Sequence, residues 1–295
     1  MNNDLMNIIK QTAAQMNEFV GESDSLSYPG SGLPDRARII AITEELRSIM
    51  FPGFFDAPSP EHNTYATGYK LTSICEAFEK QMLAAYKMKY SEEAAADKAS
   101  KTIADFVRSL PEVQRLLATD VEALYLGDPA AGSKVDVIFS YPGLLAITIY
   151  RLAHVLYLDN LPLIPRMMTE YAHSLTGIDI NAGAKIGSYF FIDHGTGIVI
   201  GETTEIGNNV KLYQGVTLGA LSTRRGQQLA GKKRHPTLGN NVTVYSGASI
   251  LGGDTVIGDD CVIGGNAFIT SSVSAGTKVS IKSPEMTFGE NVKKS

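Results

Sequence analysis

The chain has little of what disulfide-built, cysteine-ligated or membrane-spanning proteins require. Its 295 residues include only two cysteines, Cys75 and Cys261, too few for a disulfide framework or a cysteine-based metal site. So low a content is typical of a reducing compartment. The longest apolar run, 137–150, is interrupted at 140–142 and is too short to cross a bilayer. These absences indicate a soluble protein.

Charge and the first residues exclude two further classes. The net charge is −5 and the isoelectric point is about 5.6, which argues against a general nucleic-acid binder. The chain begins with polar and acidic residues, so we expect no secretory signal. We therefore expect a cytoplasmic protein.

The composition changes near residue 176. Of 28 glycines 20 lie after this point, but only 2 of 12 prolines do. Residues 1–175 carry 15 basic and 22 acidic side chains, whereas 176–295 carry 11 and 9. We predict a helical domain over 1–175, a second domain over 176–275 and a C-terminal tail over 276–295. Apolar residues at spacings of three and four predict helices at 5–20, 36–50, 68–90, 92–110, 135–156 and 163–174, and a short helix capped by Asp120 and ending near 126.

The second domain repeats an aliphatic residue every six positions. Fourteen residues follow this spacing with small breaks: Ile180, Ile186, Ile192, Ile198, Ile200, Ile206, Leu212, Leu218, Leu238, Val244, Ile250, Ile257, Ile263 and Ile269. A period of six gives one inward side chain per short strand and turn, so three hexads close a triangular coil. Glycines follow five of these residues, where a bulky Cβ would be costly: Gly201, Gly207, Gly239, Gly258 and Gly264. The predicted fold class is therefore α+β, with N-terminal helices followed by a left-handed parallel β-helix.

Two interruptions of the repeat carry candidate chemistry. His194 lies inside a hexad, next to Asp193, and imidazole exchanges protons near neutral pH. The stretch 219–237 breaks the repeat between Leu218 and Leu238, and we predict that it leaves the β-helix as a loop. This loop contains no acidic residue and five basic residues, which are Arg224, Arg225, Lys232, Lys233 and Arg234. We therefore expect it to attract phosphate or carboxylate ligands.

Several ordered motifs resemble those of the serine O-acetyltransferases, over roughly residues 120–275. They are found at 128–130, 150–154, 179–187, 193–199, 201–203, 215–219 and 234–236. The resemblance implies transfer of an acetyl group from acetyl-CoA to the hydroxyl of L-serine, on the route to cysteine. A serine hydroxyl needs a general base for this reaction, and His194 is the best candidate.

The resemblance also implies roles for other residues. It assigns Asp179 to orient His194 in a His-Asp dyad, and Asp128 and Asp193 to the serine ammonium. Arg234 and His235 would hold the serine carboxylate or stabilise the tetrahedral oxyanion. Backbone groups at Gly219, Ala220, Ser246 and Gly247 would line the pantetheine channel. The family often has a second glycine where this chain has Ala220.

The same resemblance bears on partners. Prisms of this kind pack three around an axis, so we expect a trimer with acetyl-CoA between adjacent prisms, or a hexamer joined through the helical domain. From charge alone, we expect Lys232 and Lys233, or Arg224 and Arg225, to approach the CoA phosphates. No metal is expected. Relatives that dock into O-acetylserine sulfhydrylase end in isoleucine, whereas this chain ends in Ser295, so we expect a weak complex or none.

Three alternatives stay open on sequence grounds. A CoA-dependent acyltransferase acting on a sugar would have no need of paired acids for an ammonium. A γ-type carbonic anhydrase would need three histidines on a metal, for which His173, His194 and His235 are available. A non-catalytic scaffold would use the prism for assembly alone.

Overall fold

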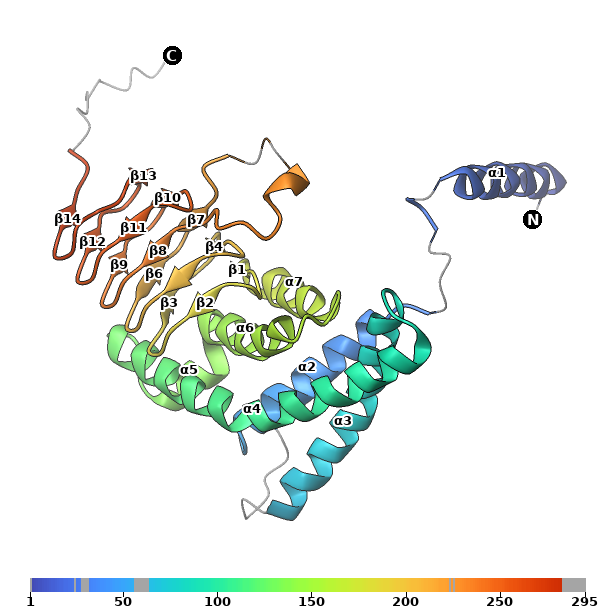
Figure 1. The fold of residues 1–295 in the computed structure, drawn as a ribbon, viewed down its shortest axis with the longest axis horizontal. Helices are drawn as coiled ribbons and strands as arrows, with labels where there is room; N and C mark the ends of the chain where they lie inside the picture. Colours follow the sequence, from blue (N-terminus) through green and yellow to red (C-terminus); the bar gives the residue numbers. More distant parts are fainter. Residues whose placement is uncertain are drawn as a thin grey trace, which may run out of the picture.

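The structure, a computed structural model, describes residues 2–23, 25–27, 32–55, 64–222, 224 and 226–282. Helices form its first part and short parallel strands its second (Figure 1). The helices are α1 (Asn3–Glu22), α2 (Arg36–Met50), α3 (Thr64–Lys87), α4 (Glu92–Gly127), α5 (Lys134–Ser140), α6 (Pro142–Leu158) and α7 (Ile164–Thr176). The predicted helix at 36–50 coincides with α2, and those at 5–20, 68–90 and 163–174 overlap α1, α3 and α7.

Helix α4 is longer than predicted. It continues through Pro111 and Asp120, so the expected end at residue 110 and the separate helix capped by Asp120 are wrong. Leu110, Val113 and Leu117 are buried on both sides of the proline. Packing along this face offsets the roughly 3 kcal/mol that a proline costs in a helix interior.

The predicted helix at 135–156 is two helices. It breaks at Tyr141, because Pro142 begins α6, and α5 and α6 meet at 72°. No single helix among the described residues is long and apolar enough to span a membrane, and this bent pair passes that test only when its two parts are joined. Most residues of α6 are buried within the protein.

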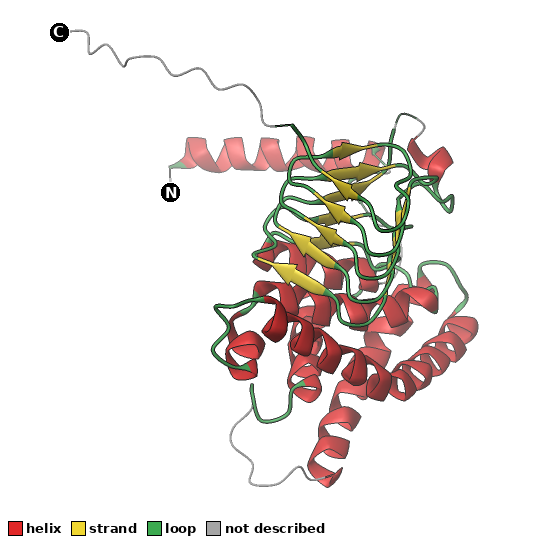
Figure 2. Cartoon of the chain, turned by 90° about the vertical axis from the view of Figure 1, so that its left-hand side faces the viewer, coloured by secondary structure: helices red, strands yellow, loops and turns green. Residues whose placement is uncertain are grey.

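The second part is the predicted left-handed β-helix (Figure 2). Three parallel sheets form its walls. One wall contains β1 (Asp179–Ile180), β4 (Val199–Ile200), β7 (Thr217–Gly219), β10 (Ser249–Leu251) and β13 (Phe268–Ile269). The second contains β2 (Lys185–Ile186), β5 (Glu205–Ile206), β8 (Thr237–Leu238) and β11 (Val256–Ile257). The third contains β3 (Phe191–Asp193), β6 (Lys211–Tyr213), β9 (Thr243–Val244), β12 (Val262–Ile263) and β14 (Lys278–Val279).

The six-residue repeat builds the core of this prism. All fourteen repeat residues are buried except Ile186, which is partly buried. Thirteen of them stack in three columns along the prism, as in the pairing of Ile200 with Leu218 and of Leu218 with Ile250. Ile198 is buried but precedes β4 and belongs to none of these columns, so its assignment to the repeat is wrong. Strand β14 pairs with β12, so the β-helix continues past residue 275, where we had expected it to end.

The glycines that follow the repeat residues are required by close approach between coils. A Cβ on Gly207 would lie 2.7 Å from the Gly239 backbone, and one on Gly239 would lie 2.2 Å from Asp259. Neither glycine adopts a positive φ. The steric cost that we predicted is therefore a collision with the next coil and not an unusual backbone turn.

A buried ion pair joins the helical domain to the prism. Arg151 of α6 donates from Nε and Nη2 to the two oxygens of Asp120 of α4, at 2.5 and 2.8 Å. Its Nη2 also donates to the carbonyl of Gly187, at 2.8 Å. Asp120 accepts a further hydrogen bond from the Phe190 backbone N–H. Two helices and the first coil are thus fixed relative to one another.

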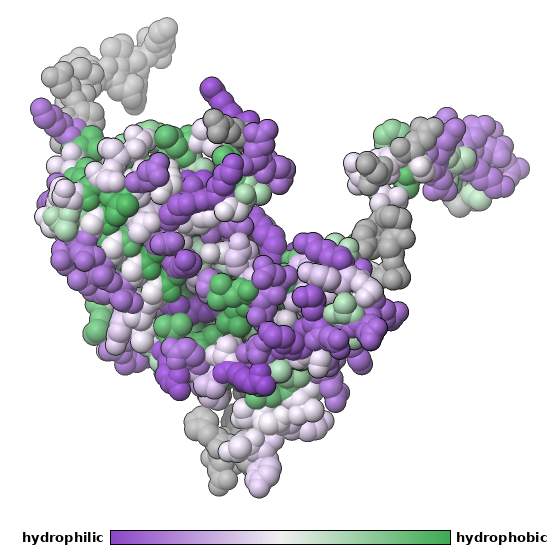
Figure 3. Space-filling view, in the orientation of Figure 1, coloured by the Kyte–Doolittle hydropathy of each residue, from purple (hydrophilic) through white to green (hydrophobic). Residues whose placement is uncertain are grey.

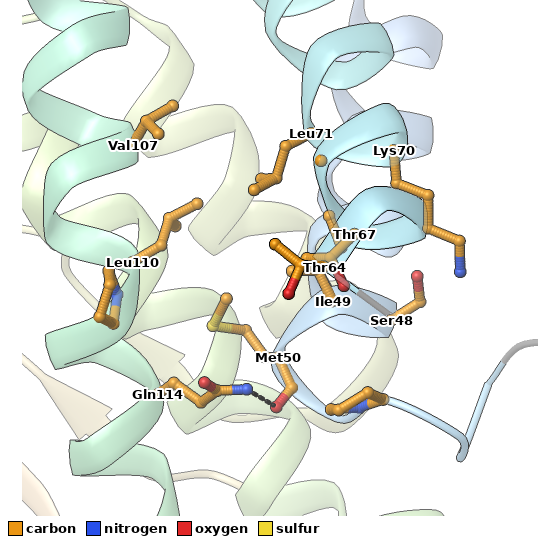
Figure 4. Close-up of a pocket in the computed structure, with 13 residues that line it drawn as sticks. Ser48, Ile49, Met50, Thr64, Thr67, Lys70, Leu71, Val107, Leu110 and Gln114 are labelled. Atoms are coloured by element: carbon orange, nitrogen blue, oxygen red, sulfur yellow. Dashed lines mark hydrogen bonds between the residues drawn. The ribbon is translucent and has the colours of Figure 1, made fainter. Parts of the chain in front are cut away.

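The helical domain also contains a cavity of about 640 Å³ between α2, α3 and α4. In Figure 4, Met50, Leu71 and Leu110 surround it, and the Gln114 amide donates to the carbonyl of Met50 at 3.1 Å. None of the residues that the sequence nominated for catalysis or binding lines this cavity. The candidate site lies on the β-helix instead.

Candidate active site

His194 lies on an extended corner of the prism. Asp193 pairs with Tyr213 in the coil above, and Val199 pairs with Thr217. Five residues connect Asp193 to Val199, whereas three connect Tyr213 to Thr217 in the next coil. The corner that carries His194 is therefore two residues longer. His194 has φ of 55°, a left-handed conformation uncommon outside glycine, and its side chain is 75% exposed. The corner directs the imidazole away from the core.

Two carboxylates lie beside this imidazole. Asp193 Oδ1 is 3.6 Å from His194 Nε2. Asp128, which caps the end of α4, accepts the Tyr141 hydroxyl at 2.5 Å and the Ala130 N–H at 2.8 Å. These two hydrogen bonds, the first above all, lower the pKa of Asp128, and the nearby His194 lowers it further. Asp128, Asp193 and His194 thus meet at one edge, which we call the base edge, between the walls of β3 and β4.

Close packing of the helical domain on β3 brings Asp128 to this edge. A Cβ on Gly127 would lie 2.4 Å from the Phe191 ring, and one on Gly143 would lie 2.6 Å from the Ile192 carbonyl oxygen. Only glycine lets the end of α4 and the start of α6 approach β3 so closely. Sequence reasoning missed Gly127, Gly143 and Tyr141, although the break at 140–142 in the apolar run was the available signal.

Asp179 lies at the start of the prism, on β1, directly below Val199 in the register. Its Oδ1 is 3.7 Å from Arg166 Nη1 of α7. Within the described chain no hydrogen bond joins Asp179 to His194. Asp179, Glu170 and His173 bring possible metal-ligand atoms within 4.8 Å of one another. Arg166 forms ion pairs with both carboxylates, so their negative charge is already balanced without a metal ion.

The predicted loop leaves the prism after β7 and returns before β8, and Thr203 holds its returning end. The Thr203 carbonyl accepts a hydrogen bond from Lys233 Nζ at 2.7 Å, and its hydroxyl accepts one from the Arg234 N–H at 2.9 Å. The Thr203 N–H donates to His235 Nδ1 at 3.0 Å. This end of the loop is therefore attached to the coil beneath it.

His235 is held as a neutral hydrogen-bond donor. Burial, together with the nearby Arg234 and Lys233, lowers the pKa of His235 to about 4. Because Nδ1 accepts the Thr203 N–H, the ring proton is assigned to Nε2. Such an imidazole suits stabilisation of negative charge better than proton removal.

Arg234 contacts acidic and backbone groups of its own chain. Its Nη2 pairs with Glu202, which also accepts the Tyr157 hydroxyl at 2.9 Å. Arg234 and Ala220 line a cavity of about 240 Å³ at the base of the loop. Gly219 lies at the same edge, between the walls of β7 and β8, which we call the loop edge.

The predicted site residues are divided between two edges of one prism. His194, Asp193 and Asp128 lie at the base edge, where Ser246 and Gly247 also turn between β9 and β10. Gly219, Ala220, Arg234 and His235 lie at the loop edge. The wall of β1, β4, β7, β10 and β13 separates the two edges.

Comparison with known proteins identifies the family. No protein-family model matches the chain. The plasmid serine acetyltransferase of Synechococcus elongatus is 44% identical over 266 residues, which cover 86% of this chain and 82% of that protein. The chain belongs to the serine acetyltransferase family. Two solved serine acetyltransferases of Entamoeba histolytica have similar folds at 34% identity. Isoform 3, in complex with cysteine, has a TM-score of 0.75, and the match covers 96% of this chain and 95% of that chain. Serine acetyltransferase 1, in complex with L-cysteine, has a TM-score of 0.73, and the match covers 94% of this chain and 100% of that chain.

Serine acetyltransferases transfer an acetyl group to the hydroxyl of L-serine in cysteine biosynthesis, and this confirms the reaction predicted from the motifs. The sugar acyltransferase, carbonic anhydrase and scaffold alternatives are thereby set aside.

Proposed function

We propose that His194 is the general base of this serine acetyltransferase. It removes the proton from the serine hydroxyl, and the serine oxygen attacks the thioester carbonyl carbon of acetyl-CoA. The tetrahedral intermediate then collapses, the C–S bond breaks, and the CoA thiolate takes from His194 the proton that came from serine. The observation that carries this proposal is the cluster of His194, Asp193 and Asp128 at the base edge.

Asp179 completes the proposed His-Asp dyad. Its place one coil below Val199 puts it near the corner that carries His194. Arg166 keeps its carboxylate paired in the single chain. The proposal therefore requires Asp179 to turn toward His194 when substrate binds. An Asp179→Asn variant should lower kcat while leaving the KM for acetyl-CoA unchanged, and an unchanged kcat would exclude the dyad.

The remaining polar groups bind the charged groups of serine and the oxyanion of the tetrahedral intermediate. Asp128 and Asp193 bind the ammonium, because two carboxylates near one point favour a cation. Arg234 binds the carboxylate, sharing its guanidinium with Glu202. His235 donates from Nε2 to the oxyanion, a bond that its neutral, Nδ1-anchored ring supports.

We infer that each complete site forms between two chains. The base edge and the loop edge carry complementary halves, and one wall separates them within a chain. Apolar side chains are interspersed with polar ones over the visible face of the β-helix (Figure 3). Val199, Tyr245 and Phe268 are exposed on the prism and are suited to burial in a trimer.

Co-expression tests the shared site. Chains with His194→Ala and chains with His235→Ala should each be inactive alone, but mixed trimers should regain activity because some boundaries pair two intact halves. Sedimentation of the purified protein checks the trimer, or a hexamer formed through the helical domain. Mixed assemblies that stay inactive would contradict the shared site.

Acetyl-CoA is proposed to lie along that boundary. Gly219 and Ala220 of one chain, with Ser246 and Gly247 of the next, would contact the pantetheine arm. Arg224 and Lys232 are exposed and free to approach the phosphates, whereas Lys233 already donates to the Thr203 carbonyl. Arg225 lies outside the described residues.

Two measurements test this part of the proposal. Neutralising Arg224, Arg225, Lys232 and Lys233 together should raise the KM for acetyl-CoA, and an unchanged KM would remove these residues from the site. A chelator should leave the rate unchanged, because the proposed steps use no metal.

The central experiment follows thiol release from acetyl-CoA with L-serine, using homoserine and a sugar as competing acceptors. Serine should be preferred. His194→Ala should lower kcat by on the order of 10²–10⁴-fold, the usual contribution of a general base. A kcat within about two-fold of the wild type would contradict the assignment of the base.

One proposal on regulation follows from the relatives. Both Entamoeba structures contain cysteine, and we propose that cysteine also competes with serine here, which initial rates at varied serine would show.

A further inference from the structure

Tyr141 links the helical domain to the base edge. It is the residue between α5 and α6, followed by Pro142, which begins α6. Its hydroxyl donates to Asp128 Oδ2 at 2.5 Å. Asp193 also acts on this phenol electrostatically. The side chain therefore lies within the cluster of Asp128, Asp193 and His194.

The geometry at Asp128 shows what this hydroxyl does. The carboxylate is only partly buried, and its two oxygens each receive one donor, the Ala130 N–H at Oδ1 and the Tyr141 O–H at Oδ2. An ionised carboxylate has about four acceptor positions, so positions remain for an ammonium. The Ala130 bond is local to the turn, whereas the Tyr141 bond ties the carboxylate to a separate helix start.

Tyr141 is itself rigidly placed. The adjacent Pro142 has a restricted φ, and Gly143 packs directly against the Ile192 carbonyl oxygen of β3. The hydrogen bond to Asp128, followed by burial, raises the pKa of Tyr141 to about 12, so the phenol remains a donor near neutral pH. The Tyr141 hydroxyl is thus a donor whose position is fixed relative to β3, the strand that ends in Asp193.

We propose that Tyr141 is a positioning residue for acceptor selection: it holds Asp128 in the orientation that receives the ammonium of serine. The inference rests on the proposed role of Asp128 and extends it. Tyr141 acts through Asp128 and not on the reacting atoms. It therefore sets the affinity for acceptors that carry an ammonium and leaves the chemistry of acetyl transfer unchanged.

The first test is Tyr141→Phe, which removes one oxygen and keeps the ring. The KM for serine should rise on the order of ten-fold, as expected for a hydrogen bond to a charged group. The kcat at saturating serine and the KM for acetyl-CoA should stay within about two-fold. Tyr171→Phe is the matched control, because the Tyr171 hydroxyl donates to Glu44 at 2.9 Å within the helical domain. It should leave all three constants unchanged.

A serine analogue without the ammonium separates positioning from general damage. The inhibition constant of 3-hydroxypropionate against serine should be the same for the wild type and for Tyr141→Phe. If Tyr141→Phe weakens this analogue as much as it weakens serine, Tyr141 supports the whole pocket and the proposal is overturned.

A double-mutant cycle with Asp128→Asn completes the test. In the Asp128→Asn background, Tyr141→Phe should cost nothing further in the KM for serine. An equal cost in both backgrounds overturns the role of Tyr141. If Asp128→Asn alone leaves the KM for serine unchanged, the failure lies in the proposed role of Asp128. If Asp128→Asn weakens serine and Tyr141→Phe does not, only the present inference fails.

Discussion

Replacing Gly201 by alanine tests whether the position of His235 matters for catalysis. A Cβ on Gly201 would lie 2.1 Å from His235 Cδ2 and 2.2 Å from Nε2. Carbon atoms in favourable contact are about 3.5 Å apart, so the ring would have to move by about 1.4 Å. It cannot do so without disturbing the hydrogen bond from the Thr203 N–H to Nδ1.

A displacement of this size should be costly for the rate. Misplacement of a catalytic group by about 1 Å can cost about 100-fold. Because the proposed bond from His235 to the oxyanion would be made in the transition state, kcat and kcat/KM for serine should fall together and the KM should change little. Thiol release from acetyl-CoA measures all three. Gly68→Ala, on an exposed turn of α3 with nothing within 4 Å of the added Cβ, is the control and should retain full activity.

The same substitution in a His235→Ala background decides whether the effect passes through the imidazole. There the alanine at 201 should cost nothing more, since no ring remains to be displaced. The reasoning is refuted if the folded Gly201→Ala enzyme keeps kcat within about three-fold of the wild type. It is refuted equally if the loss is as large without His235 as with it.

Three further predictions concern stability and assembly of the site. Asp120→Ala leaves the buried Arg151 without its partner and should lower the free energy of unfolding by about 3–5 kcal/mol, measured by denaturant titration; Glu112→Ala, at an exposed pair with Arg115, should leave the midpoint unchanged. The pKa of His235 is depressed to about 4, so the unfolded chain takes up this proton first as the pH falls. The contribution of His235 to stability should be complete above about pH 6.5 and should be lost as the pH falls from 6.5 to 4. His235→Gln should therefore make the melting temperature less dependent on pH over that range. Gly143→Ala should push α6 away from β3 and raise the KM for serine, and an unchanged KM with an unchanged melting temperature would contradict the packing argument.

The β-helix was predictable because its core is a local and repeated signal. One aliphatic side chain per hexad reaches the axis, so residues such as Ile200 and Leu218 reveal their register by spacing alone. The helical domain lacks such a signal. Pro111 marks a helix end in most sequences, but here tertiary burial of Leu110 and Val113 outweighs it. Asp120 has the chemistry of a helix cap and serves as a buried partner of Arg151 instead.

The candidate site was predictable only in part. His194, Asp193, Arg234 and His235 fall at visible breaks in the repeat, and family resemblance nominated Asp128 from outside it. The break at 140–142 marked Tyr141 in the apolar run, but it did not reveal a role, because that role depends on where α6 begins relative to the end of α4. That geometry depends on contacts of Gly127 and Gly143 with β3, which are distant in the sequence and leave no periodic trace.

The breaks in the repeat are where a β-helix can acquire chemistry. A regular coil closes with equivalent short corners, and its inward side chains are committed to the core. Two added residues at the first corner allow His194 to project at the base edge, and the stretch 219–237 allows His235 to be held against the next coil at the loop edge. Since the two insertions lie at different edges of one rigid prism, neither can reach the other by a change of rotamer. Association of prisms is therefore the simplest way for both to face one serine, and catalysis in this family member should depend on assembly as strictly as on either histidine.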